Sequence, residues 1–143
     1  MEAEDKHCFF GVHILGEMFG VDPSLLNDLT FLEESLSEGI RMSGATLCGI
    51  QSKQFEPNGV TILGLLSESH VSIHTYPEEG SLFFDAFTCG HRCQPELIAK
   101  TLSLALNPKK ENFHRIERGD KTELRQFVLP LSVRQTTIVD HAH

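Results

Sequence analysis

The densest group of polar side chains in the sequence lies between two apolar stretches, at residues 67–75. It contains three serines, two histidines and a glutamate: Ser67, Glu68, Ser69, His70, Ser72 and His74. A serine beside a histidine indicates an activated hydroxyl, because an imidazole can take the hydroxyl proton during nucleophilic catalysis. A polar edge strand, in which these groups only satisfy the backbone and solvent, gives the same pattern. The spacing alone leaves both interpretations open.

Two other kinds of chemistry are disfavoured by the spacing of the possible ligands and nucleophiles. His70 and His74 are four residues apart, as metal ligands on a helix are, but the apolar residues between them alternate as in a strand. Cys89 and Cys93, with His91 between them, lack the four suitably spaced ligands of a zinc site. No serine lies in the Gly-x-Ser-x-Gly turn of serine hydrolases. We therefore expect no metal and no hydrolase of that type.

The elements that must position these residues follow from hydrophobic periodicity and from turn residues. Strands are predicted at 9–19, 45–50, 60–66, 71–76 and 82–88, with later candidates at 113–117 and 124–129. Helices are predicted from Asp22-Pro23 to about Gly44 and from Pro95 to Asn107-Pro108. This order predicts an α+β two-layer sandwich, an antiparallel sheet with helices on one face.

Composition restricts the class of protein further. At 143 residues the chain is expected to form one domain, residues 1–143, with a loose tail over 130–143. The net charge of −8 argues against nucleic acid, whose phosphates require a basic surface. The acidic N-terminus does not resemble a signal peptide, and no apolar run reaches membrane-spanning length. We expect a soluble cytoplasmic protein with no membrane partner and with its four cysteines as thiols.

Three ordered motifs carry a resemblance to a known family. Glu68-Ser69-His70 is followed by Ile-His-Thr-Tyr-Pro-Glu at 73–78 and by Phe-Thr-Cys-Gly at 87–90. This series resembles the signature of the bacterial and archaeal S-adenosylmethionine decarboxylases. Residues 11–22, 43–46 and 117–119 are also similar to segments of that family, so the resemblance covers roughly residues 11–119.

The resemblance implies a proenzyme that makes its own cofactor. Ser69 would attack the Glu68 carbonyl and, after elimination, become a pyruvoyl group, which splits the chain into residues 1–68 and 69–143. His74 would be the base for this elimination, and the Thr61 hydroxyl, where the family commonly has serine, a second helper. Cys89 would protonate the product carbon after carbon dioxide leaves, since a thiol still holds its proton at neutral pH. Neither a metal nor pyridoxal phosphate is implied.

The resemblance also implies how substrate is bound. Glu78 matches the acid that holds ribose hydroxyls, and Phe55 matches an aromatic residue that can stack on adenine. The substrate would be S-adenosylmethionine, consumed in polyamine (spermidine) synthesis. The protein would be a homodimer of two-chain protomers, with its sites near the subunit interface.

Departures from the family leave alternatives open. Phe83 and Phe84 replace the small residues that usually precede Asp85, and they either fill a gap in the core or narrow the pocket. A narrowed pocket would favour ornithine or arginine, also cationic amino acids, whose charged end could face Glu17 or Glu78. A catalytically silent homologue that acts as a binding or regulatory partner is the alternative of another class.

Overall fold

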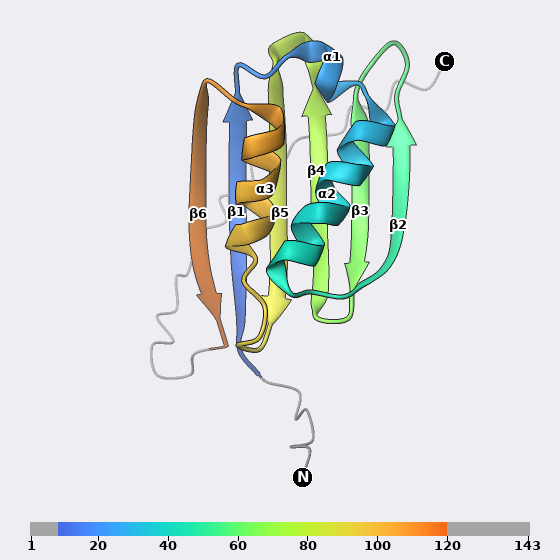
Figure 1. Ribbon diagram of the computed structural model, residues 1–143. Coiled ribbons are helices and arrows are strands. Elements are labelled where there is room, and N and C mark those ends of the chain that lie inside the picture. Colours follow the sequence, from blue (N-terminus) through green and yellow to red (C-terminus); the bar gives the residue numbers. More distant parts are fainter. Residues whose placement is uncertain (1–8, 120–143) are drawn as a thin grey trace, which may run out of the picture.

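Six strands form one antiparallel sheet in the computed structural model, which describes residues 9–119. The strands are β1 (Gly11–Phe19), β2 (Leu47–Gln54), β3 (Val60–Leu66), β4 (Ser69–Tyr76), β5 (Ser81–Cys89) and β6 (Lys110–Arg118). Their order across the sheet is β2-β3-β4-β5-β1-β6 (Figure 1). The tight turn between β3 and β4 lies at one end of the sheet, which we call the lower end. The 3-10 helix η1 (Pro77–Glu79) lies at the opposite, upper end.

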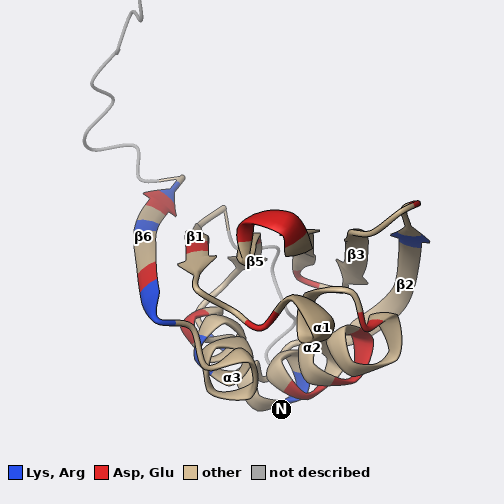
Figure 2. Cartoon of the chain, turned by 90° about the horizontal axis from the view of Figure 1, so that it is seen from above, with Lys and Arg blue, Asp and Glu red and all other residues tan. Residues whose placement is uncertain are grey.

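The three α-helices of the described residues lie on one face of this sheet (Figure 2). They are α1 (Pro23–Leu26), α2 (Leu29–Ser43) and α3 (Glu96–Leu106). Apolar residues at four-residue spacing on α2 and α3 are buried against the strands: Leu32, Leu36, Ile40, Ile98, Leu102 and Leu106. The expected α+β two-layer sandwich is therefore confirmed.

The single helix predicted over 22–44 was wrong, because the chain turns at Asn27 and Asp28 and forms two helices. The Asp28 carboxylate accepts a hydrogen bond from the Phe31 N–H (3.0 Å) and so begins a new helix. The Asn27 side chain accepts from the Gly59 N–H (2.9 Å), and its backbone carbonyl accepts from the Gln54 side chain (2.9 Å). The break thus ties the helical layer to the loop between β2 and β3 at the upper end.

Strand boundaries differ modestly from the expectation. β2 runs to Gln54 and β6 begins at Lys110, so both outer strands are longer than predicted. The strand predicted at 124–129 and the tail over 130–143 lie outside the described residues. No helix of the described part of the chain is long and apolar enough to cross a membrane.

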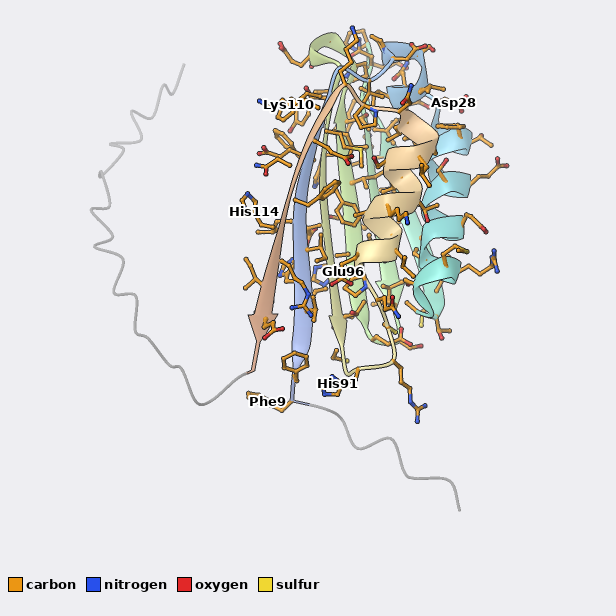
Figure 3. All side chains as sticks on the ribbon, turned by 60° about the vertical axis from the view of Figure 1, so that its left-hand side comes forward. Phe9, Asp28, His91, Glu96, Lys110 and His114 are labelled. Carbon is orange, nitrogen blue, oxygen red and sulfur yellow. The ribbon has the colours of Figure 1, made fainter. Side chains whose placement is uncertain are left out.

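Within residues 9–119 no element covers the face of the sheet away from the helices, and we call it the open face (Figure 2). Alternation along each strand sends one set of side chains to this face. Large apolar side chains among them are between 40% and 63% exposed: Leu15, Leu63, Leu65, Phe83, Tyr76 and Ile116. Histidines lie on it too, and Figure 3 shows His114 of β6 pointing away from the helices. Several large apolar side chains exposed on one face of a sheet are typical of an interaction site.

Candidate active site

The turn between β3 and β4 holds the Glu68–Ser69 peptide bond at the lower end. Leu66 pairs with Ser69, so only Ser67 and Glu68 form the turn. The Cys89 N–H donates a hydrogen bond to the Glu68 carbonyl oxygen (3.0 Å). The backbone of Thr46 makes two further hydrogen bonds to this turn. Its N–H donates to the Glu68 carboxylate (3.1 Å), and its carbonyl accepts from the Ser67 N–H (3.0 Å). Backbone groups of β5 and of the segment before β2 therefore hold the turn, and the Cys89 N–H fixes the carbonyl that Ser69 is expected to attack.

Ser69 itself has a strained backbone. Its φ of 149° lies in a region that residues with a Cβ rarely adopt. Such a conformation costs on the order of 1–3 kcal/mol and persists only where the surroundings impose it. The backbone contacts of Glu68 and Ser67 supply that constraint, so strain is stored directly beside the expected cleavage bond.

The cysteines near this turn have distinct environments. Cys48, Cys89 and Cys93 are thiols, as expected, and Cys8 lies outside the described residues. Burial raises the pKa of the Cys93 thiol, and the nearby Glu68 carboxylate adds to the increase. Cys93 is therefore held protonated away from solvent, whereas Cys89 is only partly buried and ends β5 beside the Glu68–Ser69 peptide bond.

The upper end carries the other predicted residues. The Thr61 hydroxyl lies 3.0 Å from Nδ1 of His74, across the β3–β4 pair. Glu78 is exposed on η1, which is one of the acidic segments seen in Figure 2. Phe55 follows β2 and is 46% exposed. Its Cβ and the Pro77 ring both lie about 4.0 Å from where a Cβ on Gly59 would be, so Phe55 and η1 are close neighbours.

Within one chain, the predicted site residues at the lower end of the sheet lie far from those at the upper end. Ser69 and His74 are five residues apart on β4, which corresponds to about 16 Å along a strand. Cys89 lies at the Ser69 end, and Thr61 lies at the His74 end. One chain thus holds a cleavage group at the lower end and a second group of predicted site residues at the upper end.

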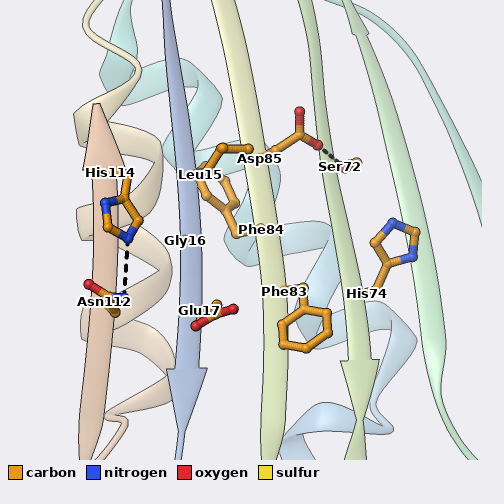
Figure 4. A pocket seen from close by; sticks show the side chains of 10 residues that line it. All are labelled: Leu15, Gly16, Glu17, Ser72, His74, Phe83, Phe84, Asp85, Asn112 and His114. Atoms are coloured by element: carbon orange, nitrogen blue, oxygen red, sulfur yellow. Dashed lines mark hydrogen bonds between the residues drawn. The ribbon is translucent and has the colours of Figure 1, made fainter. Parts of the chain in front are cut away.

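A hollow of about 490 Å³ lies on the open face between β4 and β6 (Figure 4). His74, Glu17, Phe83 and Asp85 are among its lining residues. Phe83 is 42% exposed there and packs against Tyr76, with ring centroids 5.2 Å apart. Its side chain therefore faces the site and does not fill the core.

Phe84 has the opposite orientation. It is buried at 4% exposure, and its ring meets Phe113 edge to face at 6.5 Å on the helical side of the sheet. Of the two alternatives left open for Phe84, the structure therefore favours filling the core, because consecutive strand side chains point to opposite faces.

A hydrogen-bonded network on the open face was not foreseen from the sequence. Asp85 accepts hydrogen bonds from Nε2 of His13 (2.8 Å) and of His70 (3.1 Å), and from the Ser72 hydroxyl. Arg118 lies 3.4 Å from Nδ1 of His13, and since a guanidinium only donates, Nε2 must carry the His13 proton. Burial opposes ionisation of Asp85, but the hydrogen bonds from Ser72, His13 and His70 outweigh it and hold its pKa below the ordinary value.

Among the described residues, the ligand atoms of His13, His70 and Asp85 lie within 4.8 Å of one another, as metal binding requires. A cation there would have to displace the His13 Nε2 proton beside the Arg118 guanidinium, so the geometry fits a proton-sharing network better. The expected absence of a metal stays a prediction. The sequence could not have predicted this network. His13 and Asp85 are 72 positions apart, and only the register between β1 and β5 brings them together.

An antiparallel sheet with one helical layer defines a two-layer α+β protein, and it places a serine with a strained backbone beside the end of the strand that carries Cys89. Comparison with known proteins makes the class specific. Residues 12–119 match the family model of S-adenosylmethionine decarboxylase. The chain belongs to this family.

Similar proteins include bacterial and archaeal members. The S-adenosylmethionine decarboxylase proenzyme 2 of Bacillus anthracis is 44% identical over 114 residues, 80% of this chain and 93% of that protein. The proenzyme of Methanococcus maripaludis is 39% identical over 109 residues, 76% of this chain and 89% of its own. The crystal structure of adenosylmethionine decarboxylase from Aquifex aeolicus has a TM-score of 0.72 at 34% identity, covering 77% of this chain and 91% of that one.

Proposed function

We propose that this protein is a proenzyme that cleaves itself between Glu68 and Ser69 and then decarboxylates S-adenosylmethionine. The observation that carries the proposal is the turn itself, where the Glu68 carbonyl accepts the Cys89 N–H (3.0 Å) next to the strained Ser69. Relatives named as proenzymes with 44% and 39% identity support it.

The turn is suited to the first step of cleavage. As the Ser69 oxygen attacks the Glu68 carbonyl carbon, negative charge develops on the carbonyl oxygen. The Cys89 N–H is already directed at this oxygen, and a donor placed in advance at an oxyanion lowers the barrier. Elimination from the resulting ester removes the Ser69 α-proton, releases the Glu68 carboxylate and leaves dehydroalanine. Water then hydrolyses the imine form of dehydroalanine to the pyruvoyl group and releases the Ser69 nitrogen as ammonia.

The residues of the lower end also fit the mature cofactor. A pyruvoyl group supplies an electrophilic ketone for the substrate amine and an electron sink for decarboxylation. Cys89, partly buried at the end of β5, is the proton donor that we assign to the product carbon.

A second copy of the chain completes the site in this proposal. His74 and Thr61 lie about 16 Å from Ser69 along β4, too far to assist cleavage in the same chain. A two-fold axis between two open faces, crossing the strands, would bring the lower end of one chain opposite the upper end of the other. The exposed apolar residues of the open face, such as Leu65 at 63%, would be buried by this packing. We therefore propose a homodimer with two shared sites.

The upper end then supplies substrate binding. We assign Glu78 to the ribose hydroxyls, Phe55 to the adenine ring and Phe83 to the wall of the same cavity. The hollow of about 490 Å³ falls within the usual range for small-molecule sites. Ornithine and arginine are the alternative substrates, in which case Glu17 in this hollow would face their charged end. A cytoplasmic location belongs to the proposal as well.

Cleavage and substrate are tested on the same sample. Denaturing electrophoresis and mass spectrometry should show residues 1–68 and 69–143 as separate chains, the second beginning with a pyruvoyl group. Ser69→Ala should stay intact, while the control Ser67→Ala, changed one turn residue away, should still be cleaved. Release of carbon dioxide should be fastest with S-adenosylmethionine.

Each outcome separates one alternative. A faster release from ornithine or arginine would overturn the substrate and keep the reaction. A chain that remains whole and releases nothing from any of the three amino acids would indicate the silent homologue.

A further inference from the structure

The hydroxyl of Thr88 is buried without a hydrogen-bond partner. Thr88 is 1% exposed, and its Oγ1 is the one buried side-chain nitrogen or oxygen left unpaired within residues 9–119. Leaving such a group unpaired destabilises a protein, so an isolated case calls for a specific explanation. Valine has the same shape and carries no such penalty, yet threonine occupies this position.

The location of Thr88 supplies the explanation. It is paired directly with Ser69 across the β4–β5 ladder. Side chains of directly opposed residues share a face, with their Cβ atoms about 5 Å apart. The next residue, Cys89, holds the Glu68 carbonyl through its N–H (3.0 Å). Two consecutive residues of β5 therefore face the two reacting groups of the expected cleavage step.

We infer that Thr88 is a positioning residue for self-cleavage, an inference that rests on the proposed function. Its hydroxyl accepts the hydrogen bond of the Ser69 hydroxyl in the rotamer that aims Oγ at the Glu68 carbonyl carbon. In the step itself the Oγ–C bond forms, the Glu68–Ser69 C–N bond breaks, and the hydroxyl proton ends on the released Ser69 amine. Thr88 gains a partner only as Ser69 turns toward attack, which makes the reactive arrangement more favourable than the resting one.

The matched variants are Thr88→Val, which keeps the shape, and Thr88→Ser, which keeps the hydroxyl. Cleavage is followed by electrophoresis of freshly synthesised full-length chain over time. Thr88→Val should slow cleavage about three- to tenfold or more, the value of one hydrogen bond, and Thr88→Ser should stay near wild type. In the uncleaved Ser69→Ala background, Thr88→Val should leave the melting temperature unchanged or raise it, because it removes an unpaired buried hydroxyl.

Thr75→Val is the control for a merely structural threonine. The Thr75 hydroxyl is also buried, but it donates to the Leu26 carbonyl (2.7 Å) and accepts from the Val60 N–H (2.8 Å). Its loss should lower the melting temperature and leave the cleavage rate near wild type, the reverse of Thr88→Val.

Two results would overturn the inference: a wild-type cleavage rate for Thr88→Val, or a loss of melting temperature in the Ser69→Ala background as large as that of Thr75→Val. Either result leaves the proposed function intact, since wild type still cleaves. Absence of cleavage in wild type would instead remove the proposed function and the inference with it.

Discussion

The two ends of β4 are built in different ways. At the lower end, backbone groups make the contacts. Glu68 is held by the N–H groups of Cys89 and Thr46, and Ser69 is strained at a φ of 149°. At the upper end the strand is regular, and side chains make the contact, with Thr61 3.0 Å from His74. Figure 3 shows the same separation from the side, with Phe9 and His91 at one end and Lys110 and Asp28 at the other.

The difference between the two ends of β4 corresponds to the different roles that we propose for them. In the proposed reaction, the peptide bond that breaks is held by backbone contacts beside a strained residue, whereas the base and the substrate-binding groups are side chains at the end of a regular strand. Because β4 keeps the two ends about 16 Å apart, the site that we propose is completed only when the lower end of one chain meets the upper end of another.

The largest effects are expected from removing one side chain at each end of β4, because the two losses should affect different steps. Cys89→Ala keeps the backbone N–H on Glu68, so the chain should still be cleaved, while decarboxylation should fall about 10²- to 10⁴-fold, as for a lost acid–base group. His74→Ala should accumulate uncleaved precursor or ester. Electrophoresis and carbon dioxide release on the same preparations distinguish the two.

Cys48→Ala, which removes another thiol beside the turn, is the control and should behave as wild type. Full turnover by Cys89→Ala would remove the thiol from the mechanism.

The strain at the lower end can be measured with two variants that cannot cleave. Ser69→Gly accepts a positive φ freely, whereas Ser69→Ala retains the strain. Relief of about 1–3 kcal/mol of strain exceeds the flexibility cost of glycine, about 0.5–1 kcal/mol, so Ser69→Gly should be more stable by about 1 kcal/mol. Chemical denaturation of both uncleaved chains gives the difference. Equal stability, or a more stable alanine variant, would show that Ser69 is unstrained.

The smallest effect concerns the network between the two ends. Hydrogen bonds from Ser72, His13 and His70 hold the folded-state pKa of Asp85 below its unfolded value. The ionised carboxylate therefore stabilises the fold above the unfolded pKa of about 3.9, and this contribution is lost as the pH falls through the folded value. Stability of Asp85→Asn should consequently fall less steeply below pH 4 than that of wild type. Parallel acid titrations followed by circular dichroism would reveal it, and identical curves would count against the network.

Much of the fold was accessible from the sequence, because period-2 and period-3.6 patterns identify strands and helices directly. The break at Asn27 and Asp28 was not, since the apolar spacing from Leu25 to Leu29 continues through it and only the contacts of Asn27 with the β2–β3 loop enforce it.

The candidate site, like the fold, was predicted only in part from the sequence. Motif resemblance predicted Ser69, His74 and Cys89, and the strand spacing between Ser69 and His74 already implied their separation. The partners of Asp85 and the unpaired hydroxyl of Thr88 depend on register and burial, which a single sequence does not reveal.

The central claim, a site shared between two chains, is tested most directly by mixing two inactive variants. Ser69→Ala lacks the lower-end nucleophile and His74→Ala lacks the upper-end base, so each homodimer should release little carbon dioxide. Co-expression of the two with different tags should produce mixed dimers in which one of the two sites is intact. Random pairing then predicts about one quarter of wild-type activity, with cleavage only in the chain that keeps Ser69. Activity no higher than that of the separate variants, in a sample shown to contain mixed dimers, would contradict the account.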